Sequence, residues 1–114
     1  MTQNMTHENT VNFYDNESGQ YSKKRYEGKT ESYFQFLFRE RQRLFMDLVR
    51  SIGSELKNAN ALEIGCADGV IIKKLIEDMP DSFNSITGID VSPKMLEQAR
   101  EKTADPKAKY FLRG

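Results

Sequence analysis

Residues 63–69, Glu-Ile-Gly-Cys-Ala-Asp-Gly, place two glycines in a short segment that joins an apolar run to a helical pattern. Glycine adopts backbone conformations that are closed to other residues, and it lets main-chain N–H groups approach a ligand without an intervening Cβ. In an open α/β sheet, the point where a strand hands over to a helix is the usual ligand crevice. The segment therefore predicts a loop around a flat or polar ligand, although glycines of a plain tight turn give the same local pattern.

Asp90 is a second candidate binding residue, because it ends the next apolar run about twenty residues past the glycine loop. A carboxylate at the tip of a neighbouring strand can accept two hydrogen bonds from the vicinal hydroxyls of a ribose. By itself, Asp90 could equally cap the helix that begins at Pro93 or lie in solvent. Its combination with the glycine loop favours a nucleoside-binding site.

Cys66 is the only cysteine of the 114 residues, so the chain cannot form an internal disulfide. A small chain without disulfides fits a reducing compartment, and we expect it in the cytoplasm. A nucleophilic thiolate needs a source of activation, and the only histidine is His7, in a polar N-terminal stretch. We predict that Cys66 acts through its backbone, and we predict neither a catalytic residue nor a metal site.

The elements around these residues follow from the spacing of apolar side chains. A helical period over residues 31–56 predicts a long amphipathic helix with one buried face, Thr30 as its N-cap and an end or kink at Gly53. Further on, the pattern predicts a strand at 61–64, a helix from Val70 to Pro80, a strand at 85–91, a helix capped by Ser92 with Pro93 at its first position, and a strand at 109–112. This order predicts an α/β fold, a partial doubly wound, Rossmann-like parallel sheet with right-handed crossovers and helices on both faces.

The N-terminal residues differ in composition from the rest. Residues 1–12 are polar and predict a frayed arm, whereas aromatic residues within 13–26 predict irregular or short helical structure. We therefore divide the chain into a flexible arm, 1–30, and one α/β domain, 31–114.

Charge and hydropathy exclude several classes of partner. Seventeen Lys and Arg residues balance seventeen Asp and Glu residues, so no broad positive field is present to bind nucleic acid or an anionic membrane. The first twenty residues contain no Lys or Arg, and no apolar run approaches the roughly 20 residues of a membrane span. We expect no nucleic-acid partner and no membrane anchor.

Two blocks resemble the first two motifs of the class I S-adenosylmethionine-dependent methyltransferases: residues 61–69, Ala-Leu-Glu-Ile-Gly-Cys-Ala-Asp-Gly, and residues 88–99, Gly-Ile-Asp-Val-Ser-Pro-Lys-Met-Leu-Glu-Gln-Ala. The resemblance covers about residues 61–114. It implies the first three strands of that fold after a long helix, which is the N-terminal, cofactor-binding half. It also implies S-adenosylmethionine as cofactor and methyl transfer to a small-molecule acceptor. The family commonly has glycine where this chain has Ala67.

The same resemblance implies a set of cofactor-binding residues: Glu63, Gly65, Cys66, Ala67, Gly69, Asp90, Val91 and Met95. Among these, Glu63 would lie under the amino group and Asp90 would hold the ribose hydroxyls. Val91 and Met95 would flank the adenine. In the family an aromatic N-terminal segment often closes over the cofactor, which makes Tyr14, Tyr21 and Tyr26 the candidates for a lid.

Two other functions remain as alternatives. A dinucleotide-binding Rossmann domain shares the glycine loop, but its G-x-G-x-x-G fingerprint fails at Ala67 and Val70 in the register that starts at Gly65. The other is a non-catalytic, partner-binding fragment of the same fold. It is motivated by the strand at 61–64, which three strands alone leave as an open apolar edge. We accordingly expect the chain by itself to self-associate and not to turn over, and the resemblance ends before the half that holds the acceptor.

Overall fold

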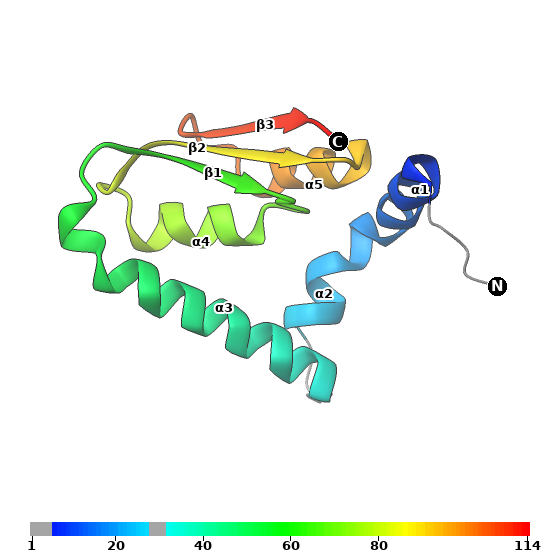
Figure 1. Ribbon diagram of the computed structural model, residues 1–114, viewed down its shortest axis with the longest axis horizontal. Coiled ribbons are helices and arrows are strands. Elements are labelled where there is room, and N and C mark those ends of the chain that lie inside the picture. The colour runs from blue at the N-terminus through cyan, green and yellow to red at the C-terminus, as the bar shows by residue number, and fades with distance from the viewer. Residues whose placement is uncertain (1–5, 28–31) are drawn as a thin grey trace.

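The computed structural model describes residues 6–27 and 32–114. Its elements, in chain order, are α1 (His7–Glu17), η1 (Ser18–Gln20), α2 (Tyr21–Tyr26), α3 (Tyr33–Ser51), η2 (Gly53–Glu55), β1 (Ala59–Ile64), α4 (Val70–Asp78), β2 (Phe83–Asp90), α5 (Pro93–Lys102) and β3 (Ala108–Leu112). The three strands form one parallel sheet in the order β1-β2-β3 (Figure 1). The alternation of strands and helices, and the α/β class, are confirmed.

Helices cover one face of this sheet, not two. Figure 1 shows α4 and α5 on the same side of the strands, with α3 beyond α4. Right-handed crossovers that always step in the same direction across a sheet place every connecting helix on the same face. On the opposite face, Leu62 and Ile64 of β1 are 61% and 78% exposed. The prediction of helices on both faces is therefore wrong for the described residues.

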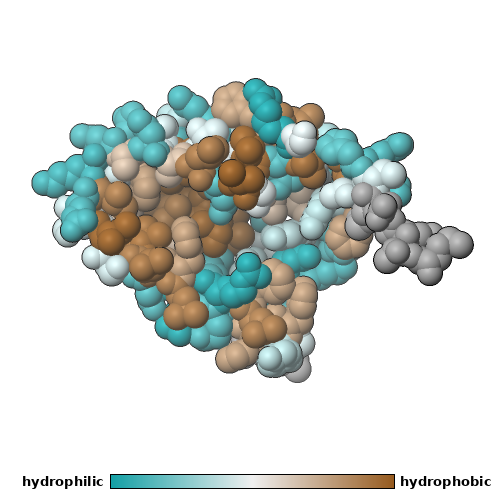
Figure 2. All heavy atoms as spheres, in the orientation of Figure 1, coloured by the Kyte–Doolittle hydropathy of each residue, from teal (hydrophilic) through white to brown (hydrophobic). Residues whose placement is uncertain are grey.

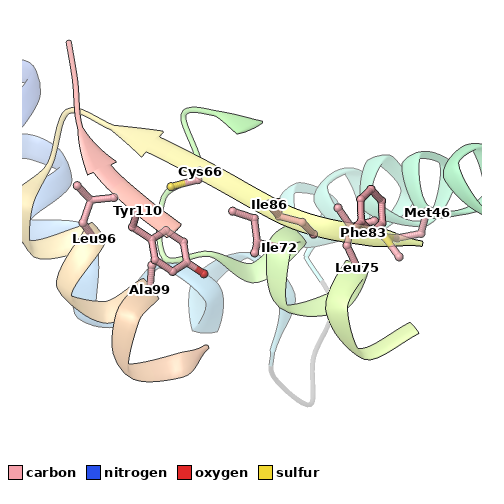
Figure 3. Packing of buried hydrophobic residues seen from close by; sticks show 9 residues of the cluster. All are labelled: Met46, Cys66, Ile72, Leu75, Phe83, Ile86, Leu96, Ala99 and Tyr110. Carbon is pink, nitrogen blue, oxygen red and sulfur yellow. The ribbon is translucent and has the colours of Figure 1, made fainter. Parts of the chain in front are cut away.

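The core lies between the covered face of the sheet and the helices. Its buried members come from α3, the β1–α4 loop, α4, β2, α5 and β3: Met46, Cys66, Ile72, Leu75, Phe83, Ile86, Leu96, Ala99 and Tyr110 (Figure 3). Gly88 of β2 has no side chain to separate the layers. A Cβ there would lie 2.8 Å from both Cys66 Sγ and Ile72 Cδ1. The glycine loop and α4 thus pack directly on the backbone of the central strand.

Helix α3 ends at Ser51, as the prediction of an early end near Gly53 requires. A capping box between Ser32 and Gln35 begins it, and the predicted cap, Thr30, lies outside the described residues. The expected buried face is largely open, because Met46 is the one buried residue of this helix. Its exposed apolar side chains are Tyr33, Phe34, Phe36, Leu37, Leu44, Phe45 and Leu48. Figure 2 shows apolar residues at the surface over α3 and over the sheet.

The N-terminal segment is more regular than its composition predicts. Residues 7–12 begin α1, and Thr6 Oγ1 caps the helix by accepting the Asn9 N–H at 3.1 Å. The prediction of a frayed arm is therefore wrong for these residues, while residues 1–5 lie outside the described part. Short helical structure over 13–26 is confirmed by α1, η1 and α2. None of the helices within 6–27 and 32–114 has the length and apolar character that crossing a membrane requires.

Candidate ligand site

The β1–α4 loop has the unusual backbone that its glycines predict. Gly65 and Gly69 have φ values of 73° and 79°, and Ala67 has a φ of 50°. The N–H groups of Gly65 and Cys66 both donate to Ile89 O, at 2.8 and 3.0 Å, and so tie the loop to the end of β2. A left-handed conformation costs a residue with a Cβ roughly 1–2 kcal/mol. This strain explains why the motif that residues 61–69 resemble commonly has glycine at the position of Ala67.

Gly69 allows the loop to rest on the neighbouring elements. A Cβ at this position would lie 2.9 Å from Tyr110 Oη and 3.1 Å from Ala99 Cβ. The Gly69 N–H donates to Cys66 O at 3.0 Å, and α4 starts at the next residue. Gly69 thus sets the close contact of the loop with α5 and β3.

Asp90 ends β2 and holds the two connecting loops together. Its Oδ2 accepts the Ala67 N–H at 2.9 Å, and its Oδ1 accepts the Ser92 N–H at 3.0 Å. The residue is 9% exposed. An ionised carboxylate has about four acceptor sites, so two backbone bonds leave acceptor capacity for a ligand. Asp90 thus links the β1–α4 loop to the β2–α5 loop, and we call this pair of hydrogen bonds the bracket. Asp90 is also a candidate ligand contact.

A cavity of about 480 Å³ opens beside this bracket, and we call it cavity A. Its lining residues are Tyr14, Tyr21, Ile64, Gly65, Ala67, Ile89, Asp90, Val91, Arg113 and Gly114. Small-molecule sites commonly have volumes of roughly 300–1,000 Å³, mostly apolar walls and a few polar groups. The structure thus brings four of the predicted cofactor residues and two of the predicted lid tyrosines together at the carboxyl ends of the strands.

A second cavity of about 460 Å³, cavity B, lies next to the first, and Tyr21 lines both. Its lining residues are Tyr21, Tyr26, Phe38, Arg41, Gln42, Leu44, Phe45, Glu63 and Ile71. Two buried atoms in this lining, Glu63 Oε1 and Gln42 Nε2, have no hydrogen-bond partner within the described part of the chain. Burial raises the pKa of Glu63 to about 7, and the negative charges of Asp90 and Asp68 add to this effect. Glu63 and Gln42 are therefore polar lining residues of cavity B whose buried acceptor and donor atoms are unused within the described residues.

Three predicted residues lie outside the lining of both cavities: Cys66, Gly69 and Met95. Cys66 is 3% exposed, and burial raises the pKa of its thiol to about 12. Its Sγ donates a weak hydrogen bond to Ala67 O at 3.7 Å. Figure 3 shows the Cys66 side chain among the core residues. Met95 is fully buried in α5. Cys66 and Met95 are thus buried residues of the interior, and Gly69 packs closely against Tyr110 and Ala99.

Sequence reasoning missed several residues of the cavity walls. Arg41 and Gln42 come from α3, more than twenty positions before the glycine loop, and no local motif connects them to it. Arg25 of α2 is not a lining residue of either cavity, but it lies over the ring of Tyr21, which lines both, 4.0 Å from the ring centroid.

Within residues 6–27 and 32–114, no group of three or more His, Cys, Asp or Glu side chains is placed to hold a metal ion.

Comparison with known proteins finds similarity to methyltransferases over the second half of the chain. A family model described as a methyltransferase domain matches residues 62–113. A malonyl-[acyl-carrier protein] O-methyltransferase from Ilyobacter polytropus is 41% identical over 56 residues, which are 49% of this chain and 20% of that protein. This chain therefore spans about one fifth of that curated relative's length.

Solved structures with the same fold span more of the chain. Magnesium protoporphyrin IX methyltransferase from Synechocystis PCC 6803, solved with bound S-adenosylhomocysteine, has a TM-score of 0.69 and 14% identity over 92% of this chain and 50% of its own. The [4+2]-cyclase SpnF has a TM-score of 0.66 and 20% identity over 96% of this chain and 43% of its own. At these identities the similarity shows the fold, and a cyclase among these proteins shows that the fold alone does not determine the reaction.

Proposed function

Because residues 62–113 belong to the methyltransferase domain family and the chain has the class I S-adenosylmethionine-dependent methyltransferase fold, we propose that it forms the cofactor-binding half of an enzyme that methylates a small-molecule acceptor. S-Adenosylmethionine is the cofactor of this family. The observation that carries the proposal is the placement of Asp90 with Gly65 and Ala67 around cavity A.

In this proposal the cofactor extends from cavity A into cavity B past Tyr21. Asp90 accepts the ribose hydroxyls, Val91 lies against the adenine, and the main chain of Gly65 and Ala67 faces the middle of the molecule. The methionine amino group would donate to Glu63, whose buried Oε1 lacks a partner within the described residues. Cys66, Gly69 and Met95 hold these residues in place from the core side.

In the proposed methyl transfer, the side chains of this chain act mainly by binding and orienting the cofactor. When bound, S-adenosylmethionine supplies a methyl group already activated by the positive sulfur. The described residues would bind the cofactor, orient it and exclude water from it, which lowers the barrier through alignment of the reactants. We assign no catalytic residue here. The tyrosines Tyr14, Tyr21 and Tyr26 would serve as the aromatic cover of the cofactor.

The acceptor and the organisation of the chain complete the proposal. The name of the Ilyobacter relative makes malonyl-acyl carrier protein one acceptor to include in a methyl-transfer assay beside small molecules. We propose that residues 1–30 cover the cofactor site of a domain formed by 31–114. A single cysteine, free and buried, supports a cytoplasmic location.

A ligand screen by thermal shift tests the proposed function. A ligand that binds only the folded chain stabilises it by about 2.7 kcal/mol at 100 times its dissociation constant. We expect S-adenosylmethionine and S-adenosylhomocysteine to raise the melting temperature, and NAD and FAD to leave it unchanged. Stabilisation by NAD without any response to the adenosyl compounds would favour the dinucleotide-binding alternative.

Proton release on binding tests the role of Glu63. With a pKa of about 7, this carboxyl is partly protonated at pH 6.5, and a ligand ammonium beside it would favour the ionised form. S-Adenosylhomocysteine should therefore release a fraction of a proton at pH 6.5. Calorimetry in buffers of different ionisation enthalpy measures this release. Methylthioadenosine, which keeps the adenosine but lacks the α-amino group of homocysteine, and a Glu63→Gln variant are the controls. Equal release with both ligands would exclude this role.

Self-association is expected of the 114-residue chain, because β1 is a sheet edge with exposed apolar side chains. Light scattering should show species larger than a monomer, and a methyl-transfer assay should show no turnover. A Leu62→Lys substitution on β1 should shift the population toward monomer more than Phe111→Lys on β3, the other edge, because Leu62 is 61% exposed and Phe111 is 45% exposed. A monodisperse monomer with measurable methyl transfer would contradict both expectations.

A further inference from the structure

The helical segment 7–26 is attached to the cofactor loops at two separate points. At the first, Ser22 Oγ of α2 donates to Asp68 Oδ2 in the β1–α4 loop, at 2.6 Å. Lys102 Nζ, at the end of α5, donates to the same oxygen at 2.6 Å. Ser22 is 8% exposed and Asp68 is fully buried. A hydroxyl-to-carboxylate bond in such surroundings is charge-assisted and shielded from water.

The second point joins α1 to the start of α5. Asp15 Oδ1 accepts a hydrogen bond from Ser92 Oγ and a longer one from the Lys94 N–H, at 3.3 Å. Ser92 is fully buried, and its Oγ also accepts the Met95 N–H at 3.1 Å as the cap of α5. Asp15 therefore bonds to the hydroxyl of Ser92, which caps α5 and follows Asp90 and Val91 in the sequence.

Both attachments occur beside a tyrosine that lines cavity A. Tyr14 precedes Asp15, and Tyr21 precedes Ser22. The partners are one residue from each of the two loops that Asp90 brackets, Asp68 in one and Ser92 in the other. Segment 7–26 is thus attached to the same two loops that the proposed cofactor would contact.

We propose that Asp15 and Ser22 are positioning residues that fasten residues 7–26 to the two cofactor loops and thereby hold Tyr14 and Tyr21 against the bound cofactor. This inference rests on the proposed function for the identity of the ligand. The fastening itself is a property of the ligand-free chain. Loss of either bond removes one attachment and frees one end of the segment. Asp68 would keep its bond from Lys102, Ser92 would keep its bond from the Met95 N–H, and the sheet would keep its own hydrogen bonds.

Hydrogen exchange of the full 114-residue chain tests the fastening. In Ser22→Ala and Asp15→Ala, amides within 7–26 should exchange at least tenfold faster, and those of Phe83–Asp90 should not change. Ser18→Ala is the matched control, because its buried Oγ donates to Asp15 O in its own segment, at 2.8 Å. Asp15→Asn keeps an acceptor for Ser92 and should restore slow exchange. Unchanged exchange, or an equal increase in Phe83–Asp90, would overturn the proposal.

Dissociation of S-adenosylhomocysteine tests the consequence for the ligand. Both alanine variants should release it at least fivefold faster than the wild-type chain, and Asp15→Asn should release it at the wild-type rate. Faster exchange with an unchanged dissociation rate would overturn the positioning role. Absence of binding to the wild-type chain would instead refute the proposed function, and the exchange data would still decide whether Asp15 and Ser22 fasten the segment.

Discussion

An Asp90→Ala substitution is expected to weaken binding of S-adenosylhomocysteine by at least tenfold. A hydrogen bond to a charged acceptor contributes roughly 1.5–3 kcal/mol, and 1.4 kcal/mol corresponds to a factor of ten in affinity. The same change removes the acceptors of the Ala67 and Ser92 N–H groups, which Asp90 bonds at 2.9 and 3.0 Å. Loss of the ribose contact and of the bracket between the loops should therefore act in the same direction. Isothermal titration calorimetry measures the effect.

The Asp90→Asn variant separates these two contributions. An asparagine keeps one acceptor oxygen, but its amide nitrogen would oppose one of the two backbone N–H groups. We expect an intermediate affinity, and circular dichroism must show both variants folded. Wild-type affinity in a folded Asp90→Ala variant would mean that Asp90 serves the loops alone.

A Gly69→Val substitution is expected to lower the free energy of unfolding by about 3 kcal/mol, the sum of a left-handed backbone penalty and overpacking. The φ of 79° disfavours any residue with a Cβ, and β-branching increases the strain. The new Cβ would also lie 2.9 Å from Tyr110 Oη. Urea denaturation at a fixed protein concentration measures the loss.

Gly19→Ala is the matched control for this prediction. A Cβ at Gly19 would meet no atom within 4 Å, so the unfolding free energy should change by less than about 0.5 kcal/mol. Equal stability of the Gly69→Val and wild-type chains would show that the loop can relax, and the close packing on α5 would then not be required for folding.

Local patterns predicted most of the elements because their signals are local. The cap at Ser92 with Pro93 at the first helical position is confirmed, and so is the end of α3 before Gly53. The arrangement of the helices was not predicted correctly, because periodicity shows that a strand has apolar residues but not which neighbour covers them. The exposed side chains of Leu62 and Ile64 illustrate this difference.

Part of the candidate site could likewise be predicted. Glycine conformations and an acid at a strand tip have local signatures, so Gly65 and Asp90 were identified and do line cavity A. Gln42 and Ser22 could not be identified, because their roles depend on contacts across long sequence separations. The Ser22–Asp68 bond, for example, joins residues 46 positions apart. A buried side chain such as Met95 also cannot be distinguished by sequence from one that lines a cavity.

The position of the bound cofactor is the most direct test of the account. Titration of the ¹⁵N-labelled chain with S-adenosylhomocysteine should produce saturable shifts of the amide signals in residues 65–69 and 90–92, with smaller shifts at Tyr14 and Tyr21. Methylthioadenosine should reproduce the shifts at 90–92. Saturable shifts confined to other surfaces of the chain, or no shifts in a folded sample at millimolar ligand, would contradict a cofactor site at the carboxyl ends of β1 and β2.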